Sequence, residues 1–412
     1  MGKSIYGPIP DHWDCSSLAS LCGVDGVQTG PFGSQLHRTD YVTDGLPIIT
    51  VEHLGDNRLL HDDMPRVSSE DAARLRRYAL RKGDIVFSRV GSVDRRALVR
   101  APEDGWLFSG RCLRIRPDPT AIDSTFLSYF FGLPVFRSHI RAIAVGATMP
   151  SINTAILAGI QVIVPPLPEQ RAIAEVLGAL DDKIEANRRV RTDAAALAAA
   201  LLDAKINAAV EAGTLAIKPL GSVAKINLRS IKPSKGSIQY LDISSVGDNE
   251  MASPQAISWS DAPSRARRVA MDGDTVWSTV RPNRRSHCLV VGPPSDLVVS
   301  TGFAVLTPVA IGPSLLYGLT ERTEFVDYLV AAADGSAYPA VRADRFSEAP
   351  LPLPPEAARR EYEDETMPLR RLADTARREA DVLAQLRDAL LPKLLSGELR
   401  VRDAESLVDE AL

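Results

Sequence analysis

Short runs in which apolar and polar residues alternate fill two long stretches of the chain. In the first stretch they are IITVEHL (48–54), DIVFSRV (84–90), CLRIRP (112–117) and QVIVP (161–165), which are rich in β-branched residues and bounded by Gly, Pro or Asp. Period-two patterning of this kind predicts half-buried strands joined by turns. The second stretch has similar runs, so we expect two β-rich globular domains.

The apolar residues adopt a helical period after each of these stretches. Some 45 residues beyond Pro168 lack proline and are rich in helix formers, which predicts one long helix that closes near Gly213. A second helix is predicted from about Pro355 to Ser396. The apolar seams run through Ile173, Leu177, Leu180 and Ile184 in the first helix and through Leu383, Leu386 and Leu390 in the second. Helices about 60 Å long cannot bury such seams alone, so we expect them to pack on each other.

The two halves of the chain are copies of one unit. GDIVFSRVGSVDRR, which starts at Gly83, aligns with GDTVWSTVRPNRR, which starts at Gly273, at an offset of 190 residues. Gly55–Asn57 aligns with Gly247–Asn249, and each copy ends in a proline-rich segment before its helix. Self-similarity at such a long period indicates a duplicated domain.

These patterns predict an α+β protein with two similar β-rich mixed domains separated by two long antiparallel spacer helices, an internal pseudo-twofold repeat. The expected boundaries are 1–167 for the first domain, 168–212 for the central helix, 213–354 for the second domain, 355–400 for the C-terminal helix and 401–412 for a tail.

Composition narrows the possible classes of protein. The 412 residues include 48 Lys and Arg against 52 Asp and Glu, a net charge of −4 that excludes a uniformly basic nucleic-acid binder. The two globular stretches each carry +1, and the helical segments carry the negative charge. Four scattered cysteines without a CxxC pair favour neither disulfides nor a zinc site, and no apolar run is long enough for a membrane helix. We therefore expect a soluble protein of the reducing cytoplasm.

No motif of a common catalytic or nucleotide-binding site is present: the sequence lacks GxGxxG, Walker A, GxSxG and HExxH patterns, and its six histidines are dispersed. Asp84 and Asp274 recur in the same turn context of the two copies, which favours turn capping over catalysis. We expect that the chain itself catalyses no reaction.

Several segments together resemble the specificity (S) subunits of type I restriction-modification systems. They are GPIPDHW (7–13), GPFGSQL (30–36), GDIVFSR (83–89), GATMPSIN (146–153), PLPEQRAIAEVLGALDDKIEANRR (166–189) and LRDALLPKLLSGELRV (386–401), so the resemblance extends over nearly the whole chain. In that family two target recognition domains each read one half of a split DNA site, and modification subunits flank the helical spacer. The second copy has LPPEAAR where the first has LPEQR, which leaves open whether both modification subunits dock equally.

The resemblance implies a DNA sequence-specificity subunit in phage defence and DNA methylation. The implied partners are double-stranded DNA, two modification (methyltransferase) subunits, which would bind the S-adenosylmethionine that this chain does not, and restriction (motor-nuclease) subunits for cleavage. Two alternatives remain open: a protein-interaction scaffold with two adaptor domains, and a specificity subunit of a related restriction-methylation enzyme that is not type I. Steep loss of affinity with rising salt would separate DNA reading from the scaffold.

The candidate DNA contacts lie in loops that could present donors to base edges and phosphates. Glycines permit close approach of the backbone, and arginine offers a bidentate fork. Met149 is expected in the core. The candidates are Phe32, Gly33, Ser34, Gln35, Arg89, Ser92, Arg95, Arg96, Arg111 and Thr148 in the first copy, and Arg229, Lys232, Thr279, Arg281, Asn283, Arg284, Arg285, Tyr338 and Arg342 in the second. For any single arginine, a solvated surface charge or ion pair is the competing interpretation.

The helix entry and the two seams are the candidate interface with the modification subunits. Its residues are Glu169, Gln170, Ile173, Leu177, Leu180, Ile184, Leu383, Leu386, Leu390 and Leu394.

Overall fold

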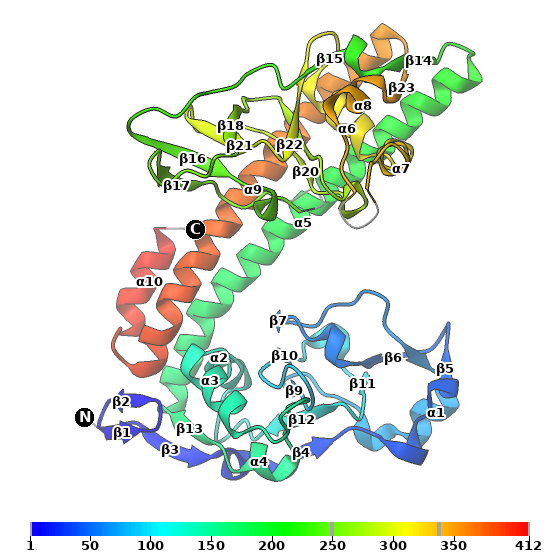
Figure 1. The fold of residues 1–412 in the computed structure, drawn as a ribbon. Coiled ribbons are helices and arrows are strands. Elements are labelled where there is room, and N and C mark those ends of the chain that lie inside the picture. The colour runs from blue at the N-terminus through cyan, green and yellow to red at the C-terminus, as the bar shows by residue number, and fades with distance from the viewer. Residues whose placement is uncertain (1, 248–250, 336–338, 411–412) are drawn as a thin grey trace. The chain divides into compact units, whose positions relative to one another are not determined.

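The computed structural model describes residues 2–247, 251–335 and 339–410 (Figure 1). The chain forms two compact units, the first from Met1–Ile184 with Asp381–Leu412 and the second from Glu185–Ala380. Both points of division fall inside the long helices α5 (Leu167–Glu211) and α9 (Glu356–Ser396). Each unit therefore consists of one globular part and one segment of each long helix.

Two main sheets form the globular part of the first unit. A five-stranded sheet has the order β4-β12-β9-β10-β7, and a four-stranded sheet has the order β11-β6-β8-β5. The strands of the larger sheet are β4 (Cys22–Thr29), β12 (Cys112–Pro117), β9 (Ile85–Ser88), β10 (Arg96–Leu98) and β7 (Asp56–Asn57). Those of the smaller sheet are β11 (Leu107–Phe108), β6 (Leu46–Ile49), β8 (Arg66–Val67) and β5 (Tyr41–Val42).

Two small strand pairs and several short helices complete this unit. The pairs are β1 (Gly2–Ser4) with β2 (Gly7–Ile9), and β3 (Asp14–Ser17) with β13 (Gln161–Val164). The helices are α1 (Ser69–Arg74), α2 (Ser124–Phe130), α3 (Pro134–Ile143) and α4 (Thr154–Ala158). The run 48–54 is a strand only at its start: Val51–His53 forms a 3-10 turn, because the His53 Nδ1 atom accepts the Thr50 N–H at 3.0 Å.

The second unit repeats this plan with fewer strands. Its sheets have the orders β15-β22-β19-β20 and β17-β16-β21-β18, and β14 pairs with β23. The strands are β14 (Ala216–Pro219), β15 (Ala224–Ile226), β16 (Ser237–Leu241), β17 (Gln255–Ser258), β18 (Ala266–Val269), β19 (Thr275–Ser278), β20 (His287–Leu289), β21 (Leu297–Ser300), β22 (Phe303–Pro308) and β23 (Pro350–Leu353). The short helices are α6 (Pro313–Glu321), α7 (Thr323–Ala331) and α8 (Ala343–Glu348).

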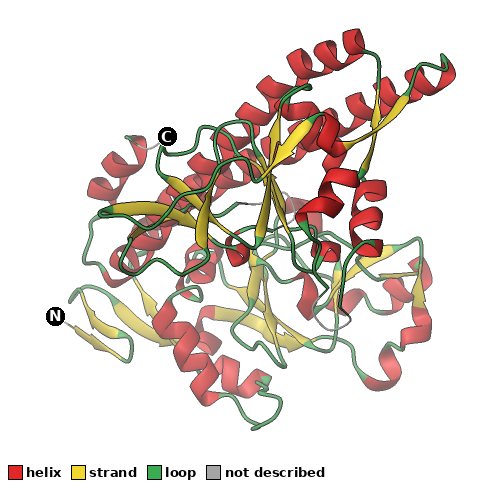
Figure 2. Cartoon of the chain, turned by 45° about the horizontal axis from the view of Figure 1, so that its top comes forward, coloured by secondary structure: helices red, strands yellow, loops and turns green. Residues whose placement is uncertain are grey.

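The duplication seen in the sequence reappears in strand order and register. β4-β12-β9-β10 of the first unit corresponds to β15-β22-β19-β20 of the second. Phe87 pairs with Leu113 in β12, and its counterpart Trp277 pairs with Ala304 in β22. Each globular part mixes strands with short helices and loops (Figure 2). The predicted fold class, two similar β-rich domains with long spacer helices, is thereby confirmed.

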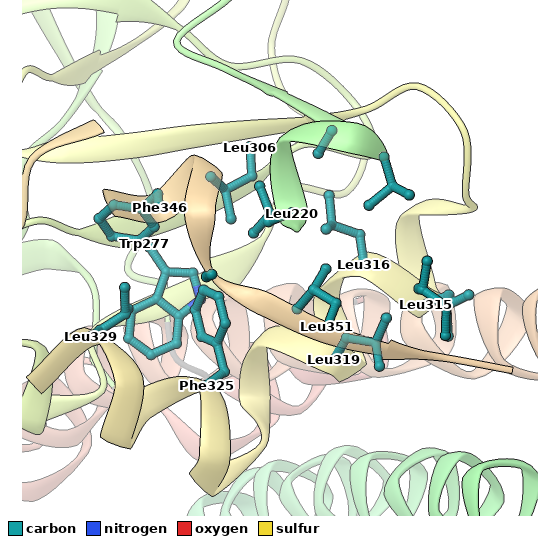
Figure 3. Close-up of a cluster of buried hydrophobic side chains, with 14 of the residues drawn as sticks. Leu220, Trp277, Leu306, Leu315, Leu316, Leu319, Phe325, Leu329, Phe346 and Leu351 are labelled. Carbon is teal, nitrogen blue, oxygen red and sulfur yellow. The ribbon is translucent and has the colours of Figure 1, made fainter. Parts of the chain in front are cut away.

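A compact apolar core holds the second unit around Trp277, which is fully buried (Figure 3). Its indole meets the Phe325 ring edge-on at a centroid distance of 5.6 Å, with Leu329 and Phe346 in the same cluster. Burial of each such side chain stabilises the fold by about 1.5–3 kcal/mol. In the first unit Phe87, the counterpart of Trp277, meets the Phe131 and Phe136 rings, whereas Phe108, Val86 and Ile48 belong to a separate core between the two sheets.

The segments of α5 and α9 pack antiparallel within each unit. In the first unit, Arg387 of α9 forms an ion pair with Asp181 of α5 at 2.7 Å, and the Tyr129 hydroxyl donates to the same carboxylate at 2.7 Å. In the second unit, Lys205 of α5 contacts Glu361 of α9 at 2.7 Å. The seam residues Leu177 and Leu383 are at most 1% exposed, and Leu202 and Ile206 of α5 belong to the core of the second unit.

The segment predicted as a tail contains a further helix, α10 (Val401–Asp409). Ala404 and Val408 are buried, because their spacing of four places both on one helical face. Among the residues that the structure describes, no helix combines the length and apolarity needed to cross a membrane.

Candidate nucleic-acid interface

Four loop segments meet at one end of the large sheet in the first unit. β9 ends at Ser88 and the antiparallel β12 begins at Cys112, so the loops at these ends are neighbours, and the Arg89 N–H donates to the Arg111 carbonyl at 2.9 Å. The Gly91 N–H donates to the Pro150 carbonyl at 2.8 Å, and the Gly30 N–H donates to the Cys112 carbonyl at 3.3 Å. We call residues 30–35, 89–95, 109–111 and 146–152 the first loop cluster.

The second unit joins three of its loop segments by equivalent bonds, and the segment after β15 binds further along β22. The Thr279 N–H donates to the Gly302 carbonyl at 2.8 Å, and the Arg281 N–H donates to the Pro339 carbonyl at 2.7 Å. Asn227 binds Val305 through its backbone N–H at 2.7 Å and through its side-chain carbonyl at 3.0 Å. We call residues 227–232, 279–285, 300–302 and 339–342 the second loop cluster.

The side chains that these two clusters expose differ in kind. The first cluster exposes Arg111, Ser92, Thr148 and the Phe32 ring, which is 62% exposed. The second cluster exposes Lys232, Asn283, Arg284 and Arg342. One scaffold therefore presents aromatic and hydroxyl groups in one unit and mainly cations with an amide in the other.

Met149 was expected in the core, and that expectation is wrong. Its side chain is 58% exposed in the first loop cluster, and Val145 nearby is 63% exposed. Gly146 has φ +107, and the Val145 and Ser151 backbones pair, so the intervening residues form a tight turn that projects outward. The glycine in GATMPSIN was the available signal for this exposure.

Other predicted contacts are half-buried and bound within their own unit. Arg95 donates to the Leu54 carbonyl and Arg285 to the Glu321 carbonyl, so these equivalent arginines anchor their turns to different neighbours. The Arg89 guanidinium donates to the Gly110 carbonyl at 3.1 Å, and the Thr279 hydroxyl donates to the Gly302 carbonyl at 2.8 Å.

Two predicted arginines lie away from the exposed surface of the clusters. Arg96 of β10 is only 4% exposed: its Nε–H donates to the Ser128 carbonyl at 2.9 Å, and its guanidinium pairs with Asp56 at 3.2 Å. Burial lowers the pKa of Arg96, an effect that Asp56 opposes. Arg229 reaches back to Asp274, at the start of β19 and thus at the opposite end of the sheet. Both are structural ion-pair partners in this structure.

Backbone conformation distinguishes the second loop cluster. Arg281 and Arg285 both have φ +52, a left-handed conformation that costs a non-glycine residue about 1–3 kcal/mol. Gly91, the counterpart of Arg281, has φ +75 without that cost. The second copy therefore keeps an arginine where glycine would be more stable, a pattern that is typical of functional turns.

The remaining predicted positions of the glycine loop are described only in part. Gly33 has φ +61 and open space around it, and the Gln35 side-chain carbonyl accepts the Tyr78 hydroxyl at 2.6 Å. The Ser34 side chain and the whole of Tyr338 lie outside the described residues.

The residues proposed for the partner interface are mostly covered by the chain itself. Gln170 is fully buried: it accepts the Asp123 N–H at 2.8 Å and donates to the Pro165 carbonyl at 2.7 Å. Glu169 accepts the Trp13 indole N–H at 3.0 Å, and Leu386 is half-buried. The seam residues Ile173, Leu177, Leu180, Ile184, Leu383, Leu390 and Leu394 are each at most 3% exposed. Any docking surface must therefore use other faces of the helices.

No group of three or more His, Cys, Asp or Glu side chains that could hold a metal ion occurs in the described part of the chain. The groups that the clusters do offer are hydrogen-bond donors, cations and apolar tips, which suit base edges and phosphates.

Comparison with known proteins points to one family. Residues 10–192 match the model of the type I restriction modification DNA specificity domain. The MjaVIII type I specificity subunit of Methanocaldococcus jannaschii is 24% identical over 191 residues, which span 45% of this chain and 44% of that protein. The chain thus aligns with less than half the length of the first relatives. The MjaIX specificity subunit of the same organism aligns over 96% of both chains at 22% identity.

The fold extends this relationship to the whole chain. The S subunit of a type I restriction-modification system from M. genitalium superposes with a TM-score of 0.61 at 17% identity, covering 94% of this chain and 96% of that one. Residues 10–192 therefore match the type I restriction modification DNA specificity domain, and the chain as a whole is similar in sequence and fold to type I specificity subunits.

Proposed function

We propose that this protein is the DNA sequence-recognition subunit of a type I restriction-modification complex, in which each unit reads one half of a bipartite site. The repeated loop clusters carry the proposal: three equivalent segments meet at the same end of each sheet, yet they expose different side chains. Two copies of one scaffold that expose different side chains suit two DNA half-sites of different sequence.

The exposed groups match the chemistry of direct readout. Arg111 and Arg284 can each offer a bidentate fork to guanine, and the Asn283 amide suits adenine. Phe32 and Met149 offer apolar surface for a thymine methyl group or an unstacked base step. Lys232 and Arg342 suit phosphates, which position the protein without specifying sequence.

Within this proposal the chain supplies recognition and geometry and catalyses nothing. Two modification subunits would dock on it and bring S-adenosylmethionine to the target base, and restriction subunits would join for cleavage. The paired helices α5 and α9 would set the length of the gap between the half-sites. Since their seams are buried, docking would use the exposed outer positions.

The decisive experiment is methylome sequencing of a host that expresses this chain together with its modification subunit, compared with a host that expresses the modification subunit alone. We expect a new bipartite motif, two short defined halves around a fixed unspecified gap. Co-purification of the two proteins without any new methylated motif would contradict the proposal.

Duplex binding as a function of salt gives an independent check against a scaffold role. A DNA reader releases counterions from several phosphates, so its affinity for duplex DNA should fall linearly on a log–log plot as salt rises. An affinity for duplex DNA that does not change with salt would favour protein interaction instead.

A further inference from the structure

A basic pocket lies at the other end of the large sheet of the first unit, away from the first loop cluster. Its lining residues come from the start of β9, the end of β12, the start of α2 and the first turns of α5, and its volume is about 330 Å³. Its charged lining consists of Arg81, Lys82, Asp84, Arg116, Asp123 and Arg171. We call these six residues the basic pocket.

Both carboxylates of the basic pocket are already satisfied. Asp84 accepts two bonds from the Arg116 guanidinium, at 2.8 and 2.7 Å, and the Arg81 backbone N–H at 2.8 Å. The Asp123 carboxylate caps α2 by accepting the Thr125 and Phe126 N–H groups, each at 2.9 Å. Arg116 therefore balances the charge of Asp84, whereas Asp123 keeps its negative charge beside the pocket.

Three cations remain at the rim. Arg81, Lys82 and Arg171 are exposed, and none forms an ion pair within 4.0 Å with a residue that the structure describes. Two acids lie close to the lining: Asp104, whose carboxylate accepts the Lys82 backbone N–H at 2.9 Å, and Asp118, between the lining residues Pro117 and Pro119. Burial together with the nearby Arg116 and Arg81 lowers the pKa of Arg114, although Asp84 and Asp25 act in the opposite direction. The lining itself carries four cations and two carboxylates.

The equivalent place in the second unit has a different charge pattern. Met271, Asp272 and Thr307 stand at the positions of Arg81, Lys82 and Arg116, and only Arg359 keeps the charge of Arg171. A pocket that contains Arg359 is lined by three cations and three acids, and Met271, Asp272 and Thr307 do not line it.

The second unit also supplies its own carboxylate at this place. Glu363 of α9 accepts the Ser314 and Leu315 N–H groups at 3.1 and 3.0 Å. Glu175, its counterpart in the first unit, is exposed and does not line the basic pocket. Asp123 caps the equivalent helix in the first unit, so both units place a carboxylate here and differ in the cations around it.

We propose that the basic pocket binds an Asp- or Glu-bearing segment of a partner protein. The proposal deepens the proposed function, since the partner would be another subunit of the same complex, and it makes docking on the two units unequal. DNA is the less suitable occupant, because the pocket lies at the opposite end of the sheet from the loops that would read it.

Binding of fluorescein-labelled hexaglutamate to the full chain, followed by anisotropy at low salt, tests the proposal. The variant Lys82→Gln/Arg171→Gln should weaken binding about three- to tenfold, as expected for the loss of two exposed charge pairs. The matched control Arg359→Gln, at the position equivalent to Arg171, should bind like the wild type. Thermal unfolding verifies that all variants fold, as exposed substitutions should.

Three results would overturn the proposal: no binding of hexaglutamate to the wild type, equal weakening in the control, or equal weakening of duplex DNA binding by Lys82→Gln/Arg171→Gln. The last result would place the pocket on the path of the DNA. Because the peptide assay needs no methylation, a chain that binds hexaglutamate through the basic pocket but directs no methylation would refute the proposed function alone.

Discussion

Asp84 and Asp274 show how one buried carboxylate is kept while its partner changes. Each caps the turn before its strand, by accepting the N–H of Arg81 or Met271 at 2.8 Å, as the sequence predicted. Asp84 is paired with Arg116 from β12, whereas Asp274 is paired with Arg229 from the segment after β15. The charge must be neutralised because both carboxylates are at most 2% exposed. The two units therefore neutralise equivalent buried carboxylates with arginines from different segments.

Arg284 and Arg111 should act on different halves of the DNA site. Arg284→Ala is expected to relax the methylated motif in one half, and Arg111→Ala in the other, each by about 1–3 kcal/mol if the contact is to a base edge. Methylome sequencing of the two variants measures this directly. Relaxation of the same half by both variants would contradict the assignment, and uniform loss at all sites would indicate phosphate contacts.

At the scale of single elements, the apolar seam of α9 lies in the buried interior of the first unit. Leu390 is 3% exposed, whereas Val382, about two helical turns earlier and off the seam, is 59% exposed. We expect Leu390→Ala to lower the free energy of unfolding of the first unit by about 2–5 kcal/mol, since it leaves a cavity. Val382→Ala, the control, should change it by less than about 0.5 kcal/mol. Urea unfolding followed by circular dichroism measures the free energy of unfolding of both variants. Equal losses in the two variants would mean that the seam is open to solvent.

Gln170 ties the start of α5 to the loop before α2. Gln170→Leu would leave the Asp123 N–H and the Pro165 carbonyl buried without partners, at a cost of about 1–3 kcal/mol each. The midpoint of urea unfolding should therefore fall clearly. The control Glu175→Ala changes an exposed residue of the same helix and should leave the midpoint unchanged. An unchanged midpoint in Gln170→Leu would mean that water replaces both bonds.

The sequence was sufficient for the elements and the duplication because both depend on periodic burial. The apolar seam through Ile173 predicted a long helix, and this helix is α5. Periodicity does not say what covers a seam, so it could not show that Leu383 and Leu394 are buried within the chain. Nor does the identity of an arginine reveal its direction: Arg96 points inward because a carbonyl and Asp56 lie there, and Arg111 points outward.

On the scale of the molecule, two cysteines report on the two units separately. Burial raises the pKa of Cys112, in the first unit, and of Cys288, in the second, to about 12. Neither should react with iodoacetamide at pH 8 while its unit is folded, whereas exposed Cys15 should react. Mass spectrometry of samples alkylated across a urea series gives one unfolding midpoint for each cysteine.

This labelling also tests whether the units unfold independently. Leu390→Ala lies in the first unit, so it should shift the midpoint of Cys112 and leave that of Cys288 in place. Cys15 serves as the control for reagent activity. Equal shifts of both midpoints would show that the two units unfold as a single cooperative body.

The first unit is assembled from two segments that lie far apart in the sequence, and this affects the order in which it can fold during synthesis. Its α9 segment, which begins at Asp381, leaves the ribosome only after the whole second unit has been made. Until then the Leu177 and Leu180 side of α5 lacks Leu383 and Leu390, and the pair of Asp181 with Arg387 cannot form. A nascent chain can therefore complete its second unit before its first. Messages truncated shortly before codon 381 would yield a protein whose earliest-made domain stays unfinished, a natural substrate for chaperones and proteases.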